Sequence, residues 1–272
     1  MSYFKVLGLE KEPFSTSPDP EFFYRSTSHN TALKRLEIAI RLRRGLCLIL
    51  GDVGTGKTTL SRTLLKTFQD ENDFIFHMIL DPSYKSEFQF LLSLIKMFNI
   101  VPGFKSTLDF KEALEKYLFQ KGVNENKTIV LLIDEGQKLT PENLEALRTL
   151  LNYETNEYKL LQLVIMAQIE LLPRINRIRN FMDRVVLKYT INPLDETETK
   201  EIIEFRLKQA GYNHENSLFT DGAIRLIYAQ TQGYPRRIAM LCHDALETAV
   251  MRETSMVDEE IINSLILEEI KA

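Results

Sequence analysis

The sequence has little of several features that would define a secreted, metal-binding or membrane protein. It has two cysteines in 272 residues, Cys47 and Cys242, which are far apart and suit a reducing cytosol better than a disulfide framework. Its four histidines show no metal-ligand spacing. No apolar run approaches the length of a membrane span, and the N-terminus lacks the apolar core of a signal peptide. We therefore expect a cytoplasmic protein without direct membrane insertion.

A large excess of one charge is also missing. The net charge is −4, with 44% apolar and 26% charged residues, as in an ordinary globular protein. This balance argues against strong non-specific affinity for DNA. The charge is unevenly spread, because residues 189–272 carry 8 Lys and Arg against 15 Asp and Glu, whereas residues 1–188 carry 26 against 23. The shift predicts a domain boundary near Tyr189.

What the sequence does contain is a glycine-rich stretch, GDVGTGKT at residues 51–58, between an apolar run and a helical pattern. It matches the phosphate-loop pattern, in which glycines turn backbone N–H groups inward around a phosphate. Lys57 is expected to reach the β- and γ-phosphates of ATP, and the Thr58 hydroxyl to ligate Mg²⁺. The positive end of the following helix favours the same anion. The predicted nucleotide-binding residues are Gly51, Asp52, Val53, Gly54, Thr55, Gly56, Lys57, Thr58 and Thr59.

The most hydrophobic run in the chain, residues 129–133, ends in Asp134 and Glu135. An acid at the carboxyl end of a buried parallel strand lies where open α/β sheets bind ligands. Asp134 is predicted to hold Mg²⁺ together with Thr58. Glu135 is predicted to orient and deprotonate the water that attacks the γ-phosphate. Its presence favours an ATPase over a protein that only binds the nucleotide.

Strand and helix patterns alternate between residues 46 and 191. Apolar runs predict strands at 46–50, 74–79, 129–133, 160–167 and 185–191. Amphipathic spacing predicts helices at 59–68, 86–98, 109–121, from 141 onward and at 171–182. This alternation is typical of a three-layer P-loop α/β fold with a parallel five-stranded sheet. Four helical patterns between 195 and 270 predict a small C-terminal all-α domain.

Three regions are therefore expected along the chain. Residues 1–30 are rich in aromatic and turn-forming side chains and are predicted to be an arm packed on the ATPase core. Residues 31–191 form the nucleotide-binding domain, and residues 192–272 form the helical lid. The helix that follows the arm carries Arg41, Arg43 and Arg44, which either form a solvated face or contact a partner.

Two further sets of polar residues are candidates for the site. Gln168 follows the fourth predicted strand and could hydrogen-bond the γ-phosphate or the attacking water. Arginines near the start of the fifth strand suit the charge of a transferring phosphoryl group. Because they lie far along the chain from the loop, we expect one of them to act in a neighbouring subunit. Arg184 is the first choice, Arg179 the second and Arg177 a further candidate, and the alternative is that they are surface or salt-bridged residues.

Several segments in a fixed order together resemble one family. They are Phe4, Gly8, Leu9, Pro13, Phe14, Pro18, Pro20, Phe23 and Tyr24, then the loop, the acid pair, Ala167 to Leu171, Arg184 with Val185, and Gly233 to Arg236. The chain resembles the AAA+ ATPases of the ExeA/GspA type, from the general secretion pathway. It is also similar to the transposition ATPases of the TnsC, TniB and MuB kind.

The resemblance implies a role for each motif. Residues 51–58 would be Walker A, and Asp134 with Glu135 would be Walker B. Gln168 falls at the sensor-1 position and Arg184 at the trans-acting arginine finger. Arg236 falls at sensor 2, on a lid helix that closes over the nucleotide. The implied cofactors are ATP and Mg²⁺.

The resemblance also implies partners. Such ATPases form rings or helical assemblies of their own copies, with the nucleotide between subunits. The first hypothesis is an ATP-hydrolysing motor or switch of the secretion or pilus-assembly type, with proteins of those systems as candidate partners. The alternative is a transposition regulator that binds DNA in an ATP-dependent filament. Longer secretion members continue into a membrane helix and a peptidoglycan-binding region, which this sequence does not contain, so we do not expect direct wall binding.

Overall fold

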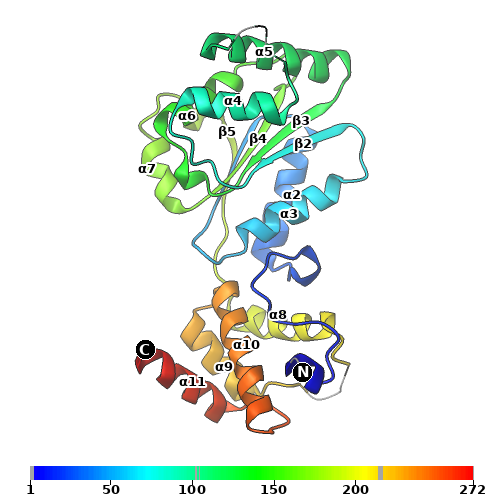
Figure 1. Ribbon diagram of the computed structural model, residues 1–272, viewed down its shortest axis with the longest axis vertical. Coiled ribbons are helices and arrows are strands. Elements are labelled where there is room, and N and C mark those ends of the chain that lie inside the picture. The colour runs from blue at the N-terminus through cyan, green and yellow to red at the C-terminus, as the bar shows by residue number, and fades with distance from the viewer. Residues whose placement is uncertain (1–2, 102, 104, 214–216, 272) are drawn as a thin grey trace. The chain divides into compact units, whose positions relative to one another are not determined.

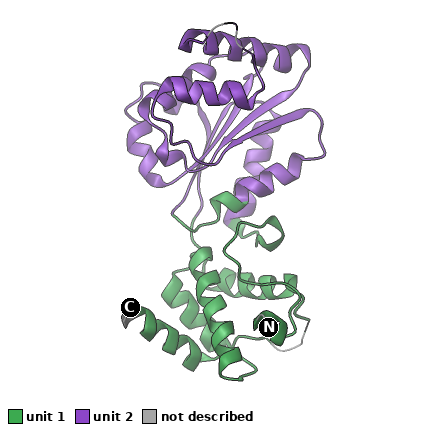
Figure 2. Cartoon of the chain, in the orientation of Figure 1, with its two compact units in different colours: residues 1–27, 53–59, 192–272 green, residues 28–52, 60–191 purple. Residues whose placement is uncertain are grey.

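The computed structural model describes residues 3–101, 103, 105–213 and 217–271. The chain divides into two compact units (Figure 2). Unit 1 comprises residues 1–27, 53–59 and 192–272, and unit 2 comprises residues 28–52 and 60–191.

Unit 2 is built on a parallel sheet. Among the described residues, five strands pair in the order β2-β3-β4-β1-β5. Every pairing is parallel, as apolar runs separated by helical crossovers predict. The strands are β1 (Leu46–Leu50), β2 (Phe74–Ile79), β3 (Thr128–Ile133), β4 (Leu161–Ala167) and β5 (Val185–Thr190). The three central strands are buried on both faces, so both faces need a covering layer.

Helices supply these two layers. Leu46, Leu48 and Leu50 of β1 join a core cluster on one face of the sheet, while Cys47 and Ile49 are buried outside this cluster. Figure 1 shows α2 and α3 on the opposite side of the sheet from α4 and α6. The helices of this part of the chain are α2 (Thr27–Arg41), α3 (Lys57–Phe68), α4 (Glu87–Met97), α5 (Thr107–Phe119), α6 (Pro141–Leu150) and α7 (Leu172–Ile175).

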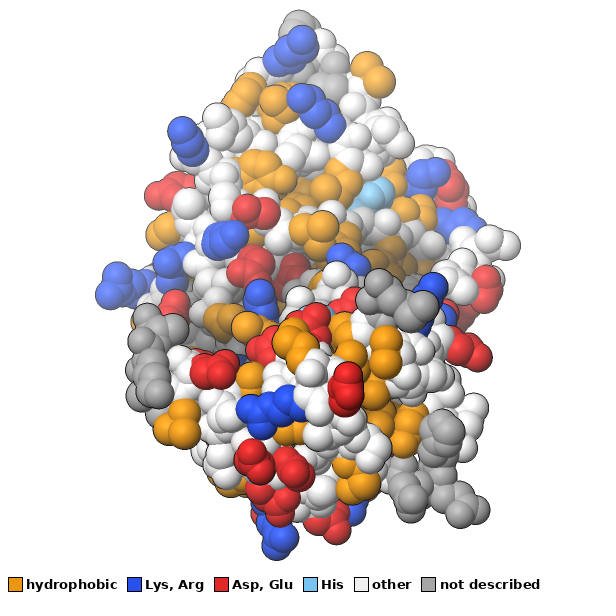
Figure 3. Space-filling view, turned by 60° about the horizontal axis from the view of Figure 1, so that its bottom comes forward, with side chains coloured by type: hydrophobic (Ala, Val, Ile, Leu, Met, Phe, Trp, Pro, Cys, Tyr) orange, Lys and Arg blue, Asp and Glu red, His pale blue; other side chains and the backbone are white. Residues whose placement is uncertain are grey.

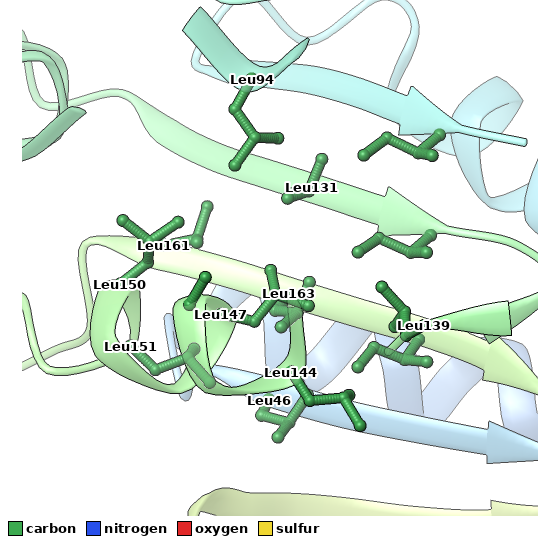
Figure 4. Close-up of a cluster of buried hydrophobic side chains, with 14 of the residues drawn as sticks. Leu46, Leu94, Leu131, Leu139, Leu144, Leu147, Leu150, Leu151, Leu161 and Leu163 are labelled. Carbon is green, nitrogen blue, oxygen red and sulfur yellow. The ribbon is translucent and has the colours of Figure 1, made fainter. Parts of the chain in front are cut away.

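Helix α6 fixes the turn that follows β3. Thr140 caps it, because its hydroxyl accepts the Asn143 N–H at 3.3 Å, and Pro141 occupies the first turn. Leu144 and Leu147 lie in the same leucine cluster as the β3 and β4 side chains (Figure 4). Burying such a side chain contributes about 1.5–3 kcal/mol. The packing therefore anchors the short segment between β3 and α6, which carries the acid pair.

The predicted helix over 171–182 is wrong beyond its first turn. α7 ends at Ile175, and the chain then continues in consecutive three-residue turns. Ile178 N–H donates to the Ile175 carbonyl and Phe181 N–H to the Ile178 carbonyl. The apolar residues Ile175, Ile178 and Phe181 are spaced by three, which these tighter turns match better than the 3.6-residue period of an α-helix. A short 3-10 turn, Met182–Arg184, then leads into β5.

Unit 1 contains the C-terminal helices α8 (Glu196–Gln209), α9 (Asp221–Thr231), α10 (Pro235–Met251) and α11 (Glu259–Lys271). Asp195 and Glu198 form a capping box at the start of α8, and the Thr220 hydroxyl caps α9. These helices share one apolar core, which includes Ile203, Ile227 and Leu246. A small all-α domain therefore forms where the sequence predicts one.

The N-terminal arm belongs to this helical unit, which corrects the prediction that it packs on the ATPase core. Phe14 is 1% exposed and lies in the helical core, with its ring edge-on to Phe219 at 6.0 Å. Tyr3 lies in the short helix α1 (Tyr3–Val6), and its hydroxyl hydrogen-bonds Nδ1 of His243 at 2.9 Å. The Arg206 guanidinium donates to a backbone carbonyl of the arm at 3.2 Å. The aromatic side chains thus complete the core of a helical domain that has few residues of its own.

Within residues 3–101, 105–213 and 217–271, none of the helices combines the length and the apolar character that a membrane span requires.

Candidate nucleotide site

The glycine-rich loop occupies residues 51–56, between the end of β1 and the start of α3. The Gly51 N–H donates to the carbonyl of Ala167 at 3.2 Å, which ties the start of the loop to the end of β4. Gly54 and Gly56 have φ of +83° and +92°, a conformation that glycine adopts at little cost. Lys57 opens α3 and is 7% exposed. A strand, a glycine turn and a helix N-terminus in this order form the setting that binds phosphate groups.

The acid pair follows β3 directly. The Asp134 N–H donates to the Ile79 carbonyl at 2.8 Å, which continues the β2–β3 pairing, and its side chain is 2% exposed. Glu135 has φ +52° and ψ +36°, the left-handed region, and its N–H donates to Asp134 Oδ1 at 2.9 Å. The Asp134 carboxylate is a hard oxygen donor of the kind that suits Mg²⁺. Thr58 is the second residue of α3, and its hydroxyl is a donor of the same kind.

The left-handed turn at Glu135 is held by its neighbours. A non-glycine residue in this region costs about 1–3 kcal/mol and persists where surrounding contacts fix it. Gly136 is buried against β4, and a Cβ added there would lie 2.5 Å from Cγ2 of Ile165. The Lys138 N–H donates to the Glu135 carbonyl at 2.9 Å. The sequence contains no turn signal at Glu135, so this geometry could not be predicted from it.

Gln168 follows β4, the strand that lies between the acid-bearing β3 and the loop-bearing β1. Ile133 is in register with Ile165, and Leu50 with Ala167, so the three strands end within a few residues of one another. The sheet therefore brings Gly51, Asp134 and Gln168 to the same edge, where ligands bind in open α/β folds.

Gln137 is a polar residue of this edge that sequence reasoning missed. Its side-chain Nε2 donates to Glu135 Oε2 at 2.7 Å, and its Oε1 accepts the Gln168 N–H at 3.1 Å. Its backbone carbonyl accepts from Nη1 of Arg174 at 2.7 Å. The only signal in the sequence is a polar residue two positions after Glu135, which by itself suggests no partner.

The three candidate finger arginines lie around the irregular segment after α7. Arg177 and Arg179 are exposed. Arg184 ends the 3-10 turn before β5, and its guanidinium hydrogen-bonds the Asn180 carbonyl at 2.9 Å and the side-chain oxygen of Asn152. Both of these hydrogen-bond partners are neutral, and the positive charge of Arg184 also contributes, after that of Arg148, to lowering the pKa of the nearby Glu145 carboxylate.

Arg236 lies in the first turn of α10 and contacts the loop segment that belongs to unit 1. Its backbone N–H donates to the Gly54 carbonyl at 3.3 Å. A Cβ added to Gly54 would lie 3.1 Å from the Arg236 Cβ. Just before α10, Gly233 has φ +73°, and a Cβ there would lie 1.8 Å from the Leu194 carbonyl oxygen. Glycine is therefore required at this position for the chain to enter α10.

The AAA domain family matches residues 40–175, half of the chain. The chain belongs to this family. The resemblance to general secretion pathway protein A is confirmed. This chain is 34% identical, over 252 residues, to the general secretion pathway protein A of Aeromonas hydrophila. The match covers 92% of this chain and 45% of the Aeromonas protein. An uncharacterised HTH-type transcriptional regulator of Methanocaldococcus jannaschii is 24% identical over 158 residues, 56% of this chain and 38% of that protein.

The chain thus spans less than half the length of these two curated relatives. Solved structures with the same fold include Drosophila ORC bound to DNA, with a TM-score of 0.73, 21% identity and coverage of 99% of this chain and 66% of that one. Aeropyrum pernix ORC2 has a TM-score of 0.68 and 16% identity, and the match covers 95% of this chain and 72% of the ORC2 chain. A point variant of Thermotoga maritima RuvB has a TM-score of 0.60 and 17% identity, and the match covers 93% of this chain and 72% of the RuvB chain. The predicted fold class, an AAA+ parallel sheet with C-terminal helices, is confirmed.

Proposed function

We propose that this AAA chain binds ATP with Mg²⁺ and hydrolyses it, acting as a nucleotide-driven switch of the secretion type in an assembly of its own copies. The observation that supports this proposal most is the order of the strands in the sheet, because it determines how the strands that carry the loop and the acid pair lie relative to each other. The loop follows β1 and the acid pair follows β3, and β4 lies between these two strands. The similarity to general secretion pathway protein A supports the secretion assignment.

Each residue has a part in the proposed reaction. Lys57 and the loop N–H groups bind the phosphates. Thr58 and Asp134 would be the residues that hold Mg²⁺, and the bound ion would supply positive charge to the phosphates. Glu135 accepts a proton from a water molecule while the water oxygen forms a bond to the γ-phosphorus. The bond from that phosphorus to the bridging oxygen of ADP breaks, and ADP and phosphate are the products. Gln168 orients the water or a γ-phosphate oxygen.

Two arginines complete the proposed site. Arg236 senses the nucleotide from the lid, next to Gly54, which its backbone contacts. Arg184 of one subunit reaches the γ-phosphate bound by its neighbour, so ATP favours the assembled state and hydrolysis removes that preference. Arg179 and Arg177 remain alternatives for this role.

The transposition alternative depends on free cationic side chains, and two of its candidates are engaged within the chain. Arg41 forms paired hydrogen bonds with Glu71 at 2.7 and 2.8 Å. Arg43 donates to Thr128 at 2.9 Å and to the Asn126 carbonyl at 2.8 Å. On the face seen in Figure 3, Lys and Arg side chains are interspersed with Asp and Glu. These observations favour the secretion-type switch over a DNA filament.

Phosphate release tests the proposal. Wild-type protein with Mg²⁺ and ATP should turn over, and Glu135→Gln should lose about 10²–10⁴-fold of that rate while still binding ATP. Glu112→Gln, the same change on the exposed surface of α5, is the matched control and should behave as wild type. Light scattering should show ATP-dependent assembly that Glu135→Gln prolongs. Equal rates for wild type and Glu135→Gln would refute hydrolysis at this site, and assembly that requires duplex DNA would support the alternative.

A further inference from the structure

Gln137 is placed between two parts of the site that lie 31 residues apart in sequence. Its amide group is used at both ends, because Nε2 donates to the Glu135 carboxylate at 2.7 Å and Oε1 accepts the Gln168 backbone N–H at 3.1 Å. The two contacts fix the orientation of the amide. If it were flipped, its oxygen would face the carboxylate and its NH₂ would face the N–H, and both contacts would be lost.

The backbone of the same turn is also restrained. Nη1 of Arg174, in α7, donates to the Gln137 carbonyl at 2.7 Å and to the Leu139 carbonyl at 2.5 Å. Gly136 is packed against β4, with no room for a side chain facing Ile165. Because both its main chain and its side chain are fixed, Gln137 has little freedom to leave the carboxylate.

We propose that Gln137 is a positioning residue, which holds the Glu135 carboxylate and couples its orientation to the segment that begins at Gln168. A carboxylate has about four acceptor sites, and the amide occupies one of them. The remaining sites stay available for the attacking water. A shift of the chain after β4 is transmitted through the amide to Glu135, so the general base and the sensor position move together. This inference rests on the proposed ATP hydrolysis.

Two substitutions separate the donor from the acceptor function of the amide. Gln137→Glu keeps an oxygen for the Gln168 N–H but cannot donate to Glu135 and places a second negative charge beside it. Gln137→Ala removes both contacts. Lys138→Ala, on an exposed residue of the same turn, is the matched control for local disturbance.

The first readout is the split between kcat and KM. Both Gln137 variants should lower kcat for ATP hydrolysis about 10- to 100-fold, with KM and ATP affinity changed less than about twofold, because the lost contact acts on the general base and not on the nucleotide. Gln137→Ala added to Glu135→Gln should lower the rate by less than about twofold, since the two residues act as one unit. Lys138→Ala should keep the wild-type kcat.

The second readout needs no turnover. Hydrogen exchange of the Gln168 amide should be slow in wild type and in Gln137→Glu, and faster in Gln137→Ala. Wild-type kcat in both Gln137 variants, with Glu135→Gln inactive, would overturn the positioning role. Unchanged Gln168 exchange in Gln137→Ala would overturn the coupling. A wild-type chain without ATP turnover would refute the proposed function instead, and Gln168 exchange would still decide the coupling.

Discussion

Replacing Gly136 by Ala tests how tightly the catalytic turn is packed on the sheet. The added Cβ would lie 2.5 Å from Ile165 Cγ2, 3.2 Å from Ala167 Cβ and 3.2 Å from the Met166 carbonyl oxygen. Ile165 belongs to the buried central strand β4 and is in register with Leu48 and Ile133 on either side, so its methyl group cannot move away without disturbing the sheet.

The expected magnitude follows from two opposing effects. Overpacking of a buried site costs about 1–3 kcal/mol. Ala restricts the unfolded chain more than Gly does, which offsets about 0.4–1 kcal/mol, and the φ of Gly136 is not in the positive range. We therefore expect Gly136→Ala to lower the free energy of unfolding by about 1–2 kcal/mol.

Urea unfolding followed by far-UV circular dichroism gives this value from the shift of the midpoint. Hydrogen exchange of the β4 amides reports the stability of the sheet unit alone. Gly103→Ala is the control, because a Cβ there would meet no atom of the described residues within 4 Å. Ile165→Leu removes the methyl branch that causes the clash, so the double variant should recover about 1 kcal/mol. A Gly136→Ala protein as stable as Gly103→Ala would refute the packing argument.

Two further predictions concern the arginine finger and a half-buried histidine, His77. Arg184→Ala should keep ATP binding but lose turnover by about 10³–10⁵-fold, whereas a variant that stays active would transfer the finger role to Arg179 or Arg177. His77 stacks on Phe98 with the two ring centroids 4.2 Å apart. Its Nε2 atom is buried and has no hydrogen-bond partner among the described residues. Burial lowers the pKa of His77 from an ordinary 6.5 to about 4. The unfolded chain binds more protons between these values, so stability should fall as the pH drops from 6.5 toward 4. Urea midpoints of His77→Leu should depend less on pH over that range, and an identical dependence in wild type and variant would contradict this reasoning.

The strands could be placed from sequence because they are short, mostly apolar runs bounded by glycines and polar residues. β1 and β2 occupy residues 46–50 and 74–79, as predicted, and β3 starts one residue earlier, at Thr128. The ends of these strands determine where the loop and the acid pair lie, so those residues could also be predicted.

The remaining features depend on tertiary contacts that periodicity does not contain. The spacing of Ile175, Ile178 and Phe181 is compatible with an α-helix and with three-residue turns, and contacts along the chain decide between them. The aromatic arm shows by composition that it packs, but its partner, the helical core around Phe219, is distant in sequence. The bridge from Gln137 to Gln168 exists only because β3 and β4 are neighbours in the sheet.

The central claim is that residues 51–58 bind ATP, and equilibrium binding of ATP with Mg²⁺ to the purified chain tests it most directly. Lys57→Ala removes the loop lysine, and Lys66→Ala removes an exposed lysine of the same helix as a control. We predict that wild type and Lys66→Ala bind about one ATP per chain with equal affinity, and that Lys57→Ala binds at least about tenfold more weakly. Equal affinity of all three proteins, or no binding by wild type, would contradict the account.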